Sequence, residues 1–598
     1  MSSARIIVSL LFVLQPLASW AQTAELPLIP APKECRVIGA RTYRLRSVTV
    51  RDDLAPTHGK DEYTLEIRRG RAVMRGNLHW AGETLRQITD AQGRVPDVSI
   101  HDWPAYPWRG FMHDTGRNFQ SVGMLKATID LMARYKMNLL HWHLTDHPAW
   151  RIECRCHPEL NDARYQRKGR DEGKFYTYDE IREVIAYADS LGVTVMPEID
   201  MPGHSAYFKE AYGFTMDSEQ GKRILEDCLR EFFEEVPASL CPFLHVGSDE
   251  IHIADPDGFS RWIQTLVSSS GRTPVVWDPG LPALPGTIRQ GWNQSFVTAL
   301  GSGRDMGCYI DSFVGYLSYF DPMMFAMRAF QHAPAGQEIP DTTLAMGGIL
   351  CLWNDVRVDK KENISLHNGM IPGMMAFAER FWLGGSGHPQ GDENLYPDPA
   401  APQGQALLGM ENRMMAHRDR YYTPETVRWT ANSKLCWDIT LAGRNLKAWG
   451  GAVDLDALCR VHSIKADDQN EAVARTVITV ARDTVVRVWL GFDIPARSDR
   501  MSTGIGEQGR WENGGRCFLN GQEILPPVQW MEPGAYNYPY HTWSKAEEEQ
   551  PYTDEQFYWM RPAVPLHLTA GRNEVMVINP HSFPGQRWSF AFIPTDWE

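Results

Sequence analysis

The chain has 598 residues, a length that predicts about three or four domains, or fewer if one of them is a barrel. Hydrophobic residues make up 43% of it and charged residues 22%, which is the composition of a folded globular protein and excludes a disordered one. The formal net charge of −14, with no extended basic run, argues against a nucleic-acid partner.

Residues 1–21 have the pattern of a secretory signal peptide. Arg5 supplies the positive start, residues 6–14 an apolar core, and residues 19–21 (Ser-Trp-Ala) a small-x-small cleavage site. No later apolar run is long enough to span a membrane. We therefore expect an exported protein, periplasmic or extracellular, that begins at Gln22 after processing. The ten cysteines show no repeated metal-type spacing and leave room for one or two disulfides after export.

Strand-rich stretches flank a long central region. Residues 22–104 contain alternating runs such as EYTLEI and one amphipathic helical stretch, which predict a small α+β domain. Residues 423–598 contain alternating strands divided by Gly- and Asn-rich turns, as in HLTAGRNEVMVI, and predict a β-sandwich. Such a sandwich would either bind sugar or only support the central region.

Residues 105–422 alternate short apolar runs with amphipathic helical segments and end in a helical connector. The runs are RGFMHD, MNLLHWHLTD, VTVMPEID, FLHVGSDE, TPVVWD, TIRQGWN, MGCYIDSF and LAMGGILCLWND. Strand-helix alternation predicts a parallel sheet, and eight units in under about 300 residues predict an α/β fold of the TIM (β/α)8 barrel type. Because nearly every run ends in His, Asp, Glu, Asn or Trp, polar chemistry should collect at the carboxyl-terminal mouth of the barrel.

The pair Asp249-Glu250, at the end of FLHVGSDE, is the sharpest candidate site. Neighbouring strand residues point to opposite faces, so both carboxylates can reach one ligand only if the strand has ended before them. Other strand ends bring further polar groups to the same mouth. These groups are His141, His143 and Asp146, then Glu198, Asp200 and His204, and finally Trp353 and Asp355. An Asp near a His near a Glu can tune a carboxyl group for proton exchange, and a Trp beside them suits the face of a sugar ring.

These motifs resemble those of glycoside hydrolase family 20, the β-N-acetylhexosaminidases. The likeness runs through YPWRGFMHDTGRNF, NLLHWHLTDHPAWRIE, GVTVMPEIDMPGHS and LHVGSDE, and it covers the barrel but not the C-terminal sandwich. It implies an exo-acting enzyme that hydrolyses terminal non-reducing GlcNAc or GalNAc β-glycosides of an oligosaccharide or glycoconjugate. In that family the substrate's own acetamido oxygen attacks the anomeric carbon, so the reaction passes through an oxazolinium ion with retention. The resemblance implies no cofactor and no metal.

The resemblance also implies a role for each candidate residue. Glu250 is similar to the general acid/base, and Asp249 to the carboxylate that holds the acetamido N–H. Tyr316 resembles the tyrosine that binds the acetamido carbonyl oxygen, and His204 and Asp146 look like the relay behind the acid. The residues similar to those that bind the sugar are Arg109, His143, Trp277, Trp292, Trp353 and Asp355.

Four positions depart from the family's usual pattern. Ser248 stands where Gly is usual, His147 where Asp is usual, Ser318 near a usual Asp or Asn, and Asp355 where Glu is usual. None of these changes removes the acid or its partner. They bear on the preference among sugars.

Two alternatives of other classes remain open from the residues alone. The pair His141-x-His143 on a barrel strand would fit a metal-dependent amidohydrolase, although such a site needs further His and Asp ligands at later strand ends. A barrel that no longer turns over substrate would be a secreted, non-catalytic sugar-binding protein.

Overall fold

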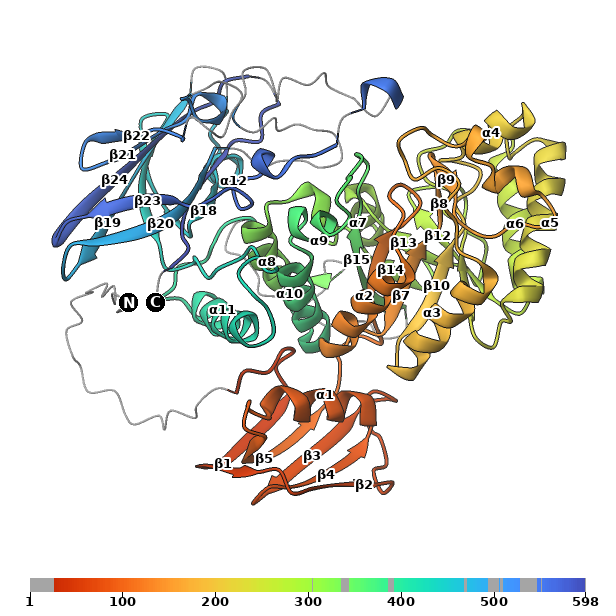
Figure 1. The fold of residues 1–598 in the computed structure, drawn as a ribbon, viewed down its shortest axis with the longest axis horizontal. Coiled ribbons are helices and arrows are strands. Elements are labelled where there is room, and N and C mark those ends of the chain that lie inside the picture. The colour runs from red at the N-terminus through yellow and green to blue at the C-terminus, as the bar shows by residue number, and fades with distance from the viewer. Residues whose placement is uncertain are drawn as a thin grey trace.

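The computed structural model describes residues 26–596, apart from positions 304, 335–343, 386–391, 467–469, 493–504, 506–508, 528–545, 550 and 584. The predicted signal peptide lies outside the described residues. Figure 1 shows a small sheet with one helix, a barrel and a β-sandwich, which follow one another along the chain. None of the described helices is long and apolar enough to cross a membrane.

The first part is a five-stranded sheet covered by one helix. Its strands lie in the order β1 (Glu34–Arg44), β5 (Arg94–Asp102), β3 (Tyr63–Arg68), β4 (Arg71–Gly76) and β2 (Ser47–Arg51). Every second residue of β3 is buried, because Tyr63, Leu65 and Ile67 share one face of the strand. Helix α1 (Leu78–Ile88) begins after Asn77, whose side chain accepts a hydrogen bond from the backbone N–H of Trp80. This helix lies between the sheet and the barrel (Figure 1).

The central part is a closed barrel of eight parallel strands, as the sequence predicts. Neighbouring strands follow chain order, and β15 closes the barrel by pairing with β6. The strands are β6 (Trp108–Asp114), β7 (Leu139–His143), β10 (Thr194–Glu198), β11 (Phe243–His245), β12 (Thr273–Asp278), β13 (Ile288–Gly291), β14 (Tyr309–Asp311) and β15 (Ala345–Leu352). Met112, Met196, Val275 and Ile349 fill the barrel interior below the mouth.

Helices and a short hairpin connect the barrel strands. The connecting elements are α2 (Val122–Arg134), β8 (Thr145–Asp146), β9 (Ala149–Trp150), α3 (Tyr178–Ser190), α4 (Ala206–Tyr212), α5 (Glu219–Glu235), α6 (Pro256–Ser269), α7 (Gln294–Gly301) and α8 (Pro322–Gln331). Two further helices, α9 (Asn363–His367) and α10 (Met370–Leu383), follow the last strand, β15. Ser121, Thr177, Ser218 and Asp255 cap the starts of α2, α3, α5 and α6 with their side-chain oxygens. The polar residue before each apolar periodic run therefore sets where that helix begins.

Helix α11 (Pro402–Tyr421) leads from the barrel to two further sheets. One sheet has the order β17 (Arg444–Trp449), β16 (Cys436–Leu441), β19 (Glu471–Val480), β24 (Gly571–Pro580), β21 (Arg516–Leu519) and β22 (Gln522–Ile524). The other has the order β18 (Ala452–Asp454), β25 (Ser589–Pro594), β20 (Thr484–Gly491) and β23 (Val564–Leu568). Helix α12 (Leu455–Val461) follows β18. The predicted fold class, a barrel flanked by sheet-containing parts, is confirmed.

Candidate active site

A tight turn after β11 brings Asp249 and Glu250 to the mouth of the barrel. Gly247, Ser248 and Glu250 have φ angles of 65°, 81° and 50°, all in the left-handed region. A Cβ on Gly247 would lie 1.8 Å from Oδ1 of Asp200, so only glycine fits at that position. The backbone N–H of Ser248 donates to the same Asp200 oxygen at 3.1 Å, which fixes the turn to the end of β10. Ser248 thus occupies a backbone conformation that favours glycine, the residue that the family usually has there.

His204 lies between the two carboxylates and a third one. Its Nε2 is 3.7 Å from Oε2 of Glu250 and 3.9 Å from Oδ1 of Asp249, and its Nδ1 is 3.9 Å from Oδ1 of Asp146. Burial lowers the pKa of His204, but Asp146, Asp200 and Asp249 outweigh it and raise the pKa to about 9. The imidazole is therefore charged at neutral pH. The structure brings together the predicted acid, its partner and the predicted relay.

The charge on His204 gives a prediction for stability against pH. A histidine whose pKa rises from 6.5 to about 9 on folding contributes stability that is complete below pH 6.5 and is lost as the pH rises through 9. We expect wild type to unfold at a higher temperature than His204→Gln at pH 6.5, by an amount that reflects on the order of 3 kcal/mol. The advantage should vanish by about pH 9.5. Thermal unfolding of both proteins across this range checks it, and a constant difference would mean that His204 is neutral in the folded protein.

Glu198 organises a buried hydrogen-bond network beneath the mouth. Its carboxylate accepts from Nε2 of His141 at 2.7 Å, from Nδ1 of His143 at 2.5 Å and from Nε1 of Trp277 at 2.7 Å. The other nitrogen of His143, Nε2, donates to Oδ2 of Asp146 at 2.8 Å. Glu198 therefore positions Asp146 through His143. The sequence placed Glu198 at a strand end without giving it a role.

The predicted role of His143 in binding substrate is wrong. Its side chain is 1% exposed, and both of its ring nitrogens are bound to carboxylates. These two carboxylates, Glu198 and Asp146, also raise its pKa well above the usual value against the opposing effect of burial. His143 is thus a buried cation that holds the network together.

Arg109 also requires a correction, because it lies at the wrong end of the barrel. It stands near the start of β6, about 17 Å of extended chain before Asp114 at the mouth. Its guanidinium is fully buried and pairs with Oδ2 of Asp61 at 2.9 Å. It also donates to the carbonyl oxygen of Lys136 at 2.8 Å and lies 5.0 Å from the ring centroid of Trp382. Arg109 therefore joins the N-terminal domain to the base of the barrel and cannot contact a sugar at the mouth.

Arg117 occupies the place that the sequence prediction gave to Arg109. It follows the end of β6, and its NH1 lies 3.0 Å from Oδ2 of Asp114 and 2.9 Å from Oδ2 of Asp146. Its Nε is 3.3 Å from Oδ1 of Asp355. Arg117 stands in the same quoted motif as Arg109, but after the strand. That position at the carboxyl end was the available sequence signal.

Aromatic side chains form the walls beside this arginine. The guanidinium of Arg117 lies 5.0 Å from the ring centroid of Trp353, and Tyr316 meets Trp353 edge-on at 5.9 Å. Trp277 is tilted against Trp353 at 5.8 Å and is almost fully buried. Among the described residues, Oδ1 of Asp249 and Nε1 of Trp353 are buried without a hydrogen-bond partner. These two polar atoms lie among aromatic side chains and can form hydrogen bonds with a ligand.

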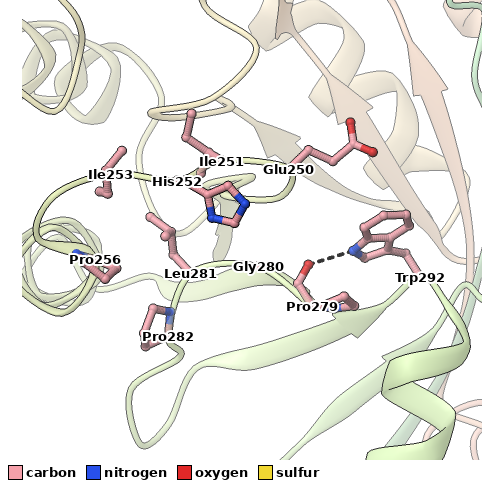
Figure 2. Close-up of a pocket in the computed structure, with 10 residues that line it drawn as sticks. All are labelled: Glu250, Ile251, His252, Ile253, Pro256, Pro279, Gly280, Leu281, Pro282 and Trp292. Carbon is pink, nitrogen blue, oxygen red and sulfur yellow. Dashed lines mark hydrogen bonds between the residues drawn. The ribbon is translucent and has the colours of Figure 1, made fainter.

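Asp355 and Trp292 lie at two edges of the site. The Asp355 side chain is 28% exposed, and burial raises its pKa to about 6 against the opposing charge of Arg117. Trp292 is half-buried, and its Nε1 donates to the carbonyl oxygen of Pro279 at 2.8 Å. Trp292 and Glu250 together border a groove of about 540 Å³, drawn in Figure 2.

A glutamate from the C-terminal region supports the arginine end of the site. Arg170 donates to the backbone carbonyl oxygen of Arg117 at 3.0 Å and also to that of Asp355. Nε of Arg170 in turn lies 3.0 Å from each carboxylate oxygen of Glu549, which is 1% exposed and also accepts from Nε of Arg167 at 3.1 Å. Glu549 thus holds Arg170 in place, and Arg170 in turn binds the backbone of Arg117 and Asp355.

From the ion pair between Glu549 and Arg170 we expect that Glu549→Ala weakens substrate binding. With Arg170 released, Arg117 and Asp355 lose their backbone support, and we expect KM to rise about tenfold with a smaller change in kcat. The matched control is Glu512→Ala, which removes a buried carboxylate paired with Arg561. Both variants should lower the unfolding temperature, but only Glu549→Ala should raise KM. An equal KM in the two variants would reduce Glu549 to a structural role.

A barrel that gathers paired carboxylates, a charged histidine and tryptophan walls at its mouth is typical of glycoside hydrolases. The sequence profile of the glycosyl hydrolase family 20 catalytic domain matches residues 106–271. The β-N-acetylhexosaminidase of Cellulomonas fimi is 28% identical over 399 residues, covering 59% of this chain and 76% of that protein. A β-hexosaminidase of Vibrio furnissii is 34% identical over 265 residues, covering 36% of this chain and 42% of that protein.

Solved structures share the fold. The N-acetyl-β-hexosaminidase of Streptomyces plicatus superimposes with a TM-score of 0.54 at 22% identity, covering 68% of this chain and 98% of that one. The profile assigns residues 106–271 to the catalytic domain of glycosyl hydrolase family 20, and the solved structures share its fold. Against the amidohydrolase alternative, its two histidines, His141 and His143, are both hydrogen-bonded to Glu198.

Proposed function

We propose that this chain is an exo-acting β-N-acetylhexosaminidase, which releases terminal non-reducing GlcNAc or GalNAc from β-glycosides by substrate-assisted, retaining catalysis. One observation carries the proposal. Charged His204 contacts Asp249 and Glu250 together, at the edge of a pocket walled by Trp353 and Tyr316. The substrate would be an oligosaccharide or glycoconjugate with a terminal N-acetylhexosamine.

The two adjacent carboxylates take different parts in this mechanism. The Glu250 side chain is 59% exposed and can deliver a proton to the glycosidic oxygen, whereas that of Asp249 is 14% exposed. Oδ1 of Asp249, which has no hydrogen-bond partner, can accept the acetamido N–H and stabilise the positive charge that develops on the nitrogen. The acetamido oxygen then attacks the anomeric carbon as the leaving group departs. Glu250, now a carboxylate, takes a proton from the water that opens the oxazolinium ion, and the configuration is retained.

Arg117, Asp355 and the aromatic walls would hold the sugar. A planar guanidinium with several donors suits two adjacent hydroxyls, and a tryptophan suits the apolar face of a pyranose. Asp355 is one methylene shorter than the usual glutamate, and Arg117 already draws its carboxylate to 3.3 Å. We therefore include both the gluco and the galacto epimers in the proposed substrate range.

The proposed location is outside the cytoplasm, in the periplasm or the extracellular space. Residues 1–21 support this location, because they combine a basic start, an apolar core and a small-x-small cleavage site.

The proposed partner is the glycan substrate and not a nucleic acid, and the net charge of −14 supports this.

Release of a chromophore from an aryl N-acetyl-β-glucosaminide, in a chelator-containing buffer, tests the proposed function. The purified chain should turn over this substrate at a rate that the chelator does not change. Binding of the sugar without turnover would instead favour the non-catalytic sugar-binding alternative.

A further inference from the structure

The groove beside Glu250 shares Glu250 and Trp292 with the predicted site, and its other lining residues are not among those predicted to hold the terminal sugar. Figure 2 places Glu250 and Trp292 at one end of it and Pro256 at the other. Residues 251–253 run along one side and residues 279–282 along the other. The residues around the sugar pocket, Arg117, Asp146, Tyr316, Trp353 and Asp355, do not line this groove.

The position of the acid determines what enters the groove. If Glu250 protonates the oxygen between the terminal sugar and the rest of the substrate, that oxygen must lie next to the Glu250 carboxylate. Glu250 lines the groove, and its carboxylate also contacts His204, which reaches Asp249 and Asp146 at the sugar pocket, so Glu250 stands where the two meet. The groove therefore receives the leaving group, and this conclusion rests on the proposed function.

The groove walls are mainly aliphatic. Ile251, Ile253 and Leu281 supply branched side chains, and prolines 256, 279 and 282 complete the surface. The polar side chains are those of Glu250, His252 and Trp292, and the indole N–H of Trp292 is already donated to Pro279. A second sugar would place its hydroxyl groups against these aliphatic walls, where few side chains could form hydrogen bonds with them. Burying polar groups without hydrogen bonds is costly.

The groove is also tied to the catalytic turn. The backbone N–H of Leu281 donates to the carbonyl oxygen of Ser248 at 2.9 Å, next to Asp249. A Cβ on Gly280 would lie 2.8 Å from the same oxygen, so the two segments approach too closely for a side chain there. The groove wall is therefore fixed relative to the acid before substrate arrives.

We propose that this groove is a leaving-group subsite for an apolar aglycone, an alkyl or aryl group, and that it favours such a group over a second sugar. The exposed imidazole of His252, which Figure 2 places between the two sides, can bind one polar group on the aglycone. The preferred natural substrate class is then a glycoside of N-acetylhexosamine with a largely apolar aglycone.

The test compares leaving groups of matched chemistry. Methyl and n-butyl N-acetyl-β-glucosaminides release primary alcohols of similar acidity, so they differ in apolar length and hardly in bond cleavage. We expect kcat/KM for the butyl glycoside to be about tenfold higher than for the methyl one. This ratio is smaller than full burial of three methylenes would give, because the groove is open to solvent. We also expect it to exceed kcat/KM for the disaccharide of two β-linked GlcNAc units.

Two variants connect the effect to the groove. Ile253→Asn should reduce the butyl-to-methyl ratio of kcat/KM to about threefold or less, since it replaces an aliphatic wall by an amide. The control is Leu240→Asn, in which an exposed leucine before β11, at the other end of the barrel, is changed in the same way and the ratio stays at its wild-type value.

Equal kcat/KM for the methyl and butyl glycosides in wild type would overturn this proposal, and so would a clear preference for the disaccharide. Both results would leave the proposed function standing. Failure to hydrolyse any of the three N-acetylhexosaminides would instead overturn the proposed function, and this inference with it.

Discussion

Replacement of Glu250 by Gln should lower kcat/KM for alkyl and sugar glycosides about a thousandfold, but only slightly for glycosides with a nitrophenol leaving group. Alkoxide leaving groups need a proton delivered as the bond breaks, whereas a nitrophenolate departs without one. The amide has the size of the carboxyl group, and the Glu250 side chain is 59% exposed, so the change should leave the fold intact. Rates on a series of leaving groups with graded acidity provide the measurement.

The slope of the rates against leaving-group pKa distinguishes the acid from other roles. In the variant, log kcat/KM should fall steeply as the leaving-group pKa rises, and in wild type it should be nearly flat. An equal loss on all leaving groups would mean that Glu250 binds or orients the substrate without protonating it.

Replacement of Arg117 by Met should lower kcat/KM about a hundredfold, whereas Arg109→Met should leave it within about twofold of wild type. Hydrogen bonds from a charged donor contribute about 1.5–3 kcal/mol, and Arg117 can offer the sugar at least one of them in addition to placing Asp355. Loss of Arg117 also leaves the carboxylates of Asp114 and Asp146 with one cation fewer, so some stability should be lost as well.

Arg109→Met should produce the opposite pattern. The change leaves the carboxylate of Asp61 without its partner and removes the link between the N-terminal domain and the barrel. Breaking a buried pair from one side costs about 3–5 kcal/mol, so the unfolding temperature should fall sharply. Kinetics and thermal unfolding of both variants check the assignment. A rise in KM for Arg109→Met with none for Arg117→Met would restore the original prediction.

The fold was largely predictable because each barrel strand is a short apolar run that ends in a polar residue. The apolar part packs inside the barrel, and the polar end emerges at the mouth, so pattern and topology agree for all eight strands. The turn at Asp249-Glu250 followed from the same logic. The strand ends before Gly247, and the left-handed backbone of Gly247, Ser248 and Glu250 then turns both carboxylates toward the mouth.

The errors in the site arose where strand position or a distant partner decides the outcome. Arg109 and Arg117 share one motif, but β6 lies between them and carries them to opposite ends of the barrel. His143 points into the barrel like many mouth residues, but its register opposite Glu198 buries it between two carboxylates. Glu549 lies 379 residues from Arg170 in the sequence, and no local pattern connects them.

In the proposed mechanism the substrate's acetamido group acts as the nucleophile. The most direct measurement compares wild-type kcat/KM on an aryl N-acetyl-β-glucosaminide and on the aryl β-glucoside with the same leaving group. The glucoside should be slower by at least about a thousandfold, because it lacks the group that forms the oxazolinium ion. Comparable rates on the two substrates, or a glycosyl group trapped covalently on an enzyme carboxylate, would contradict it.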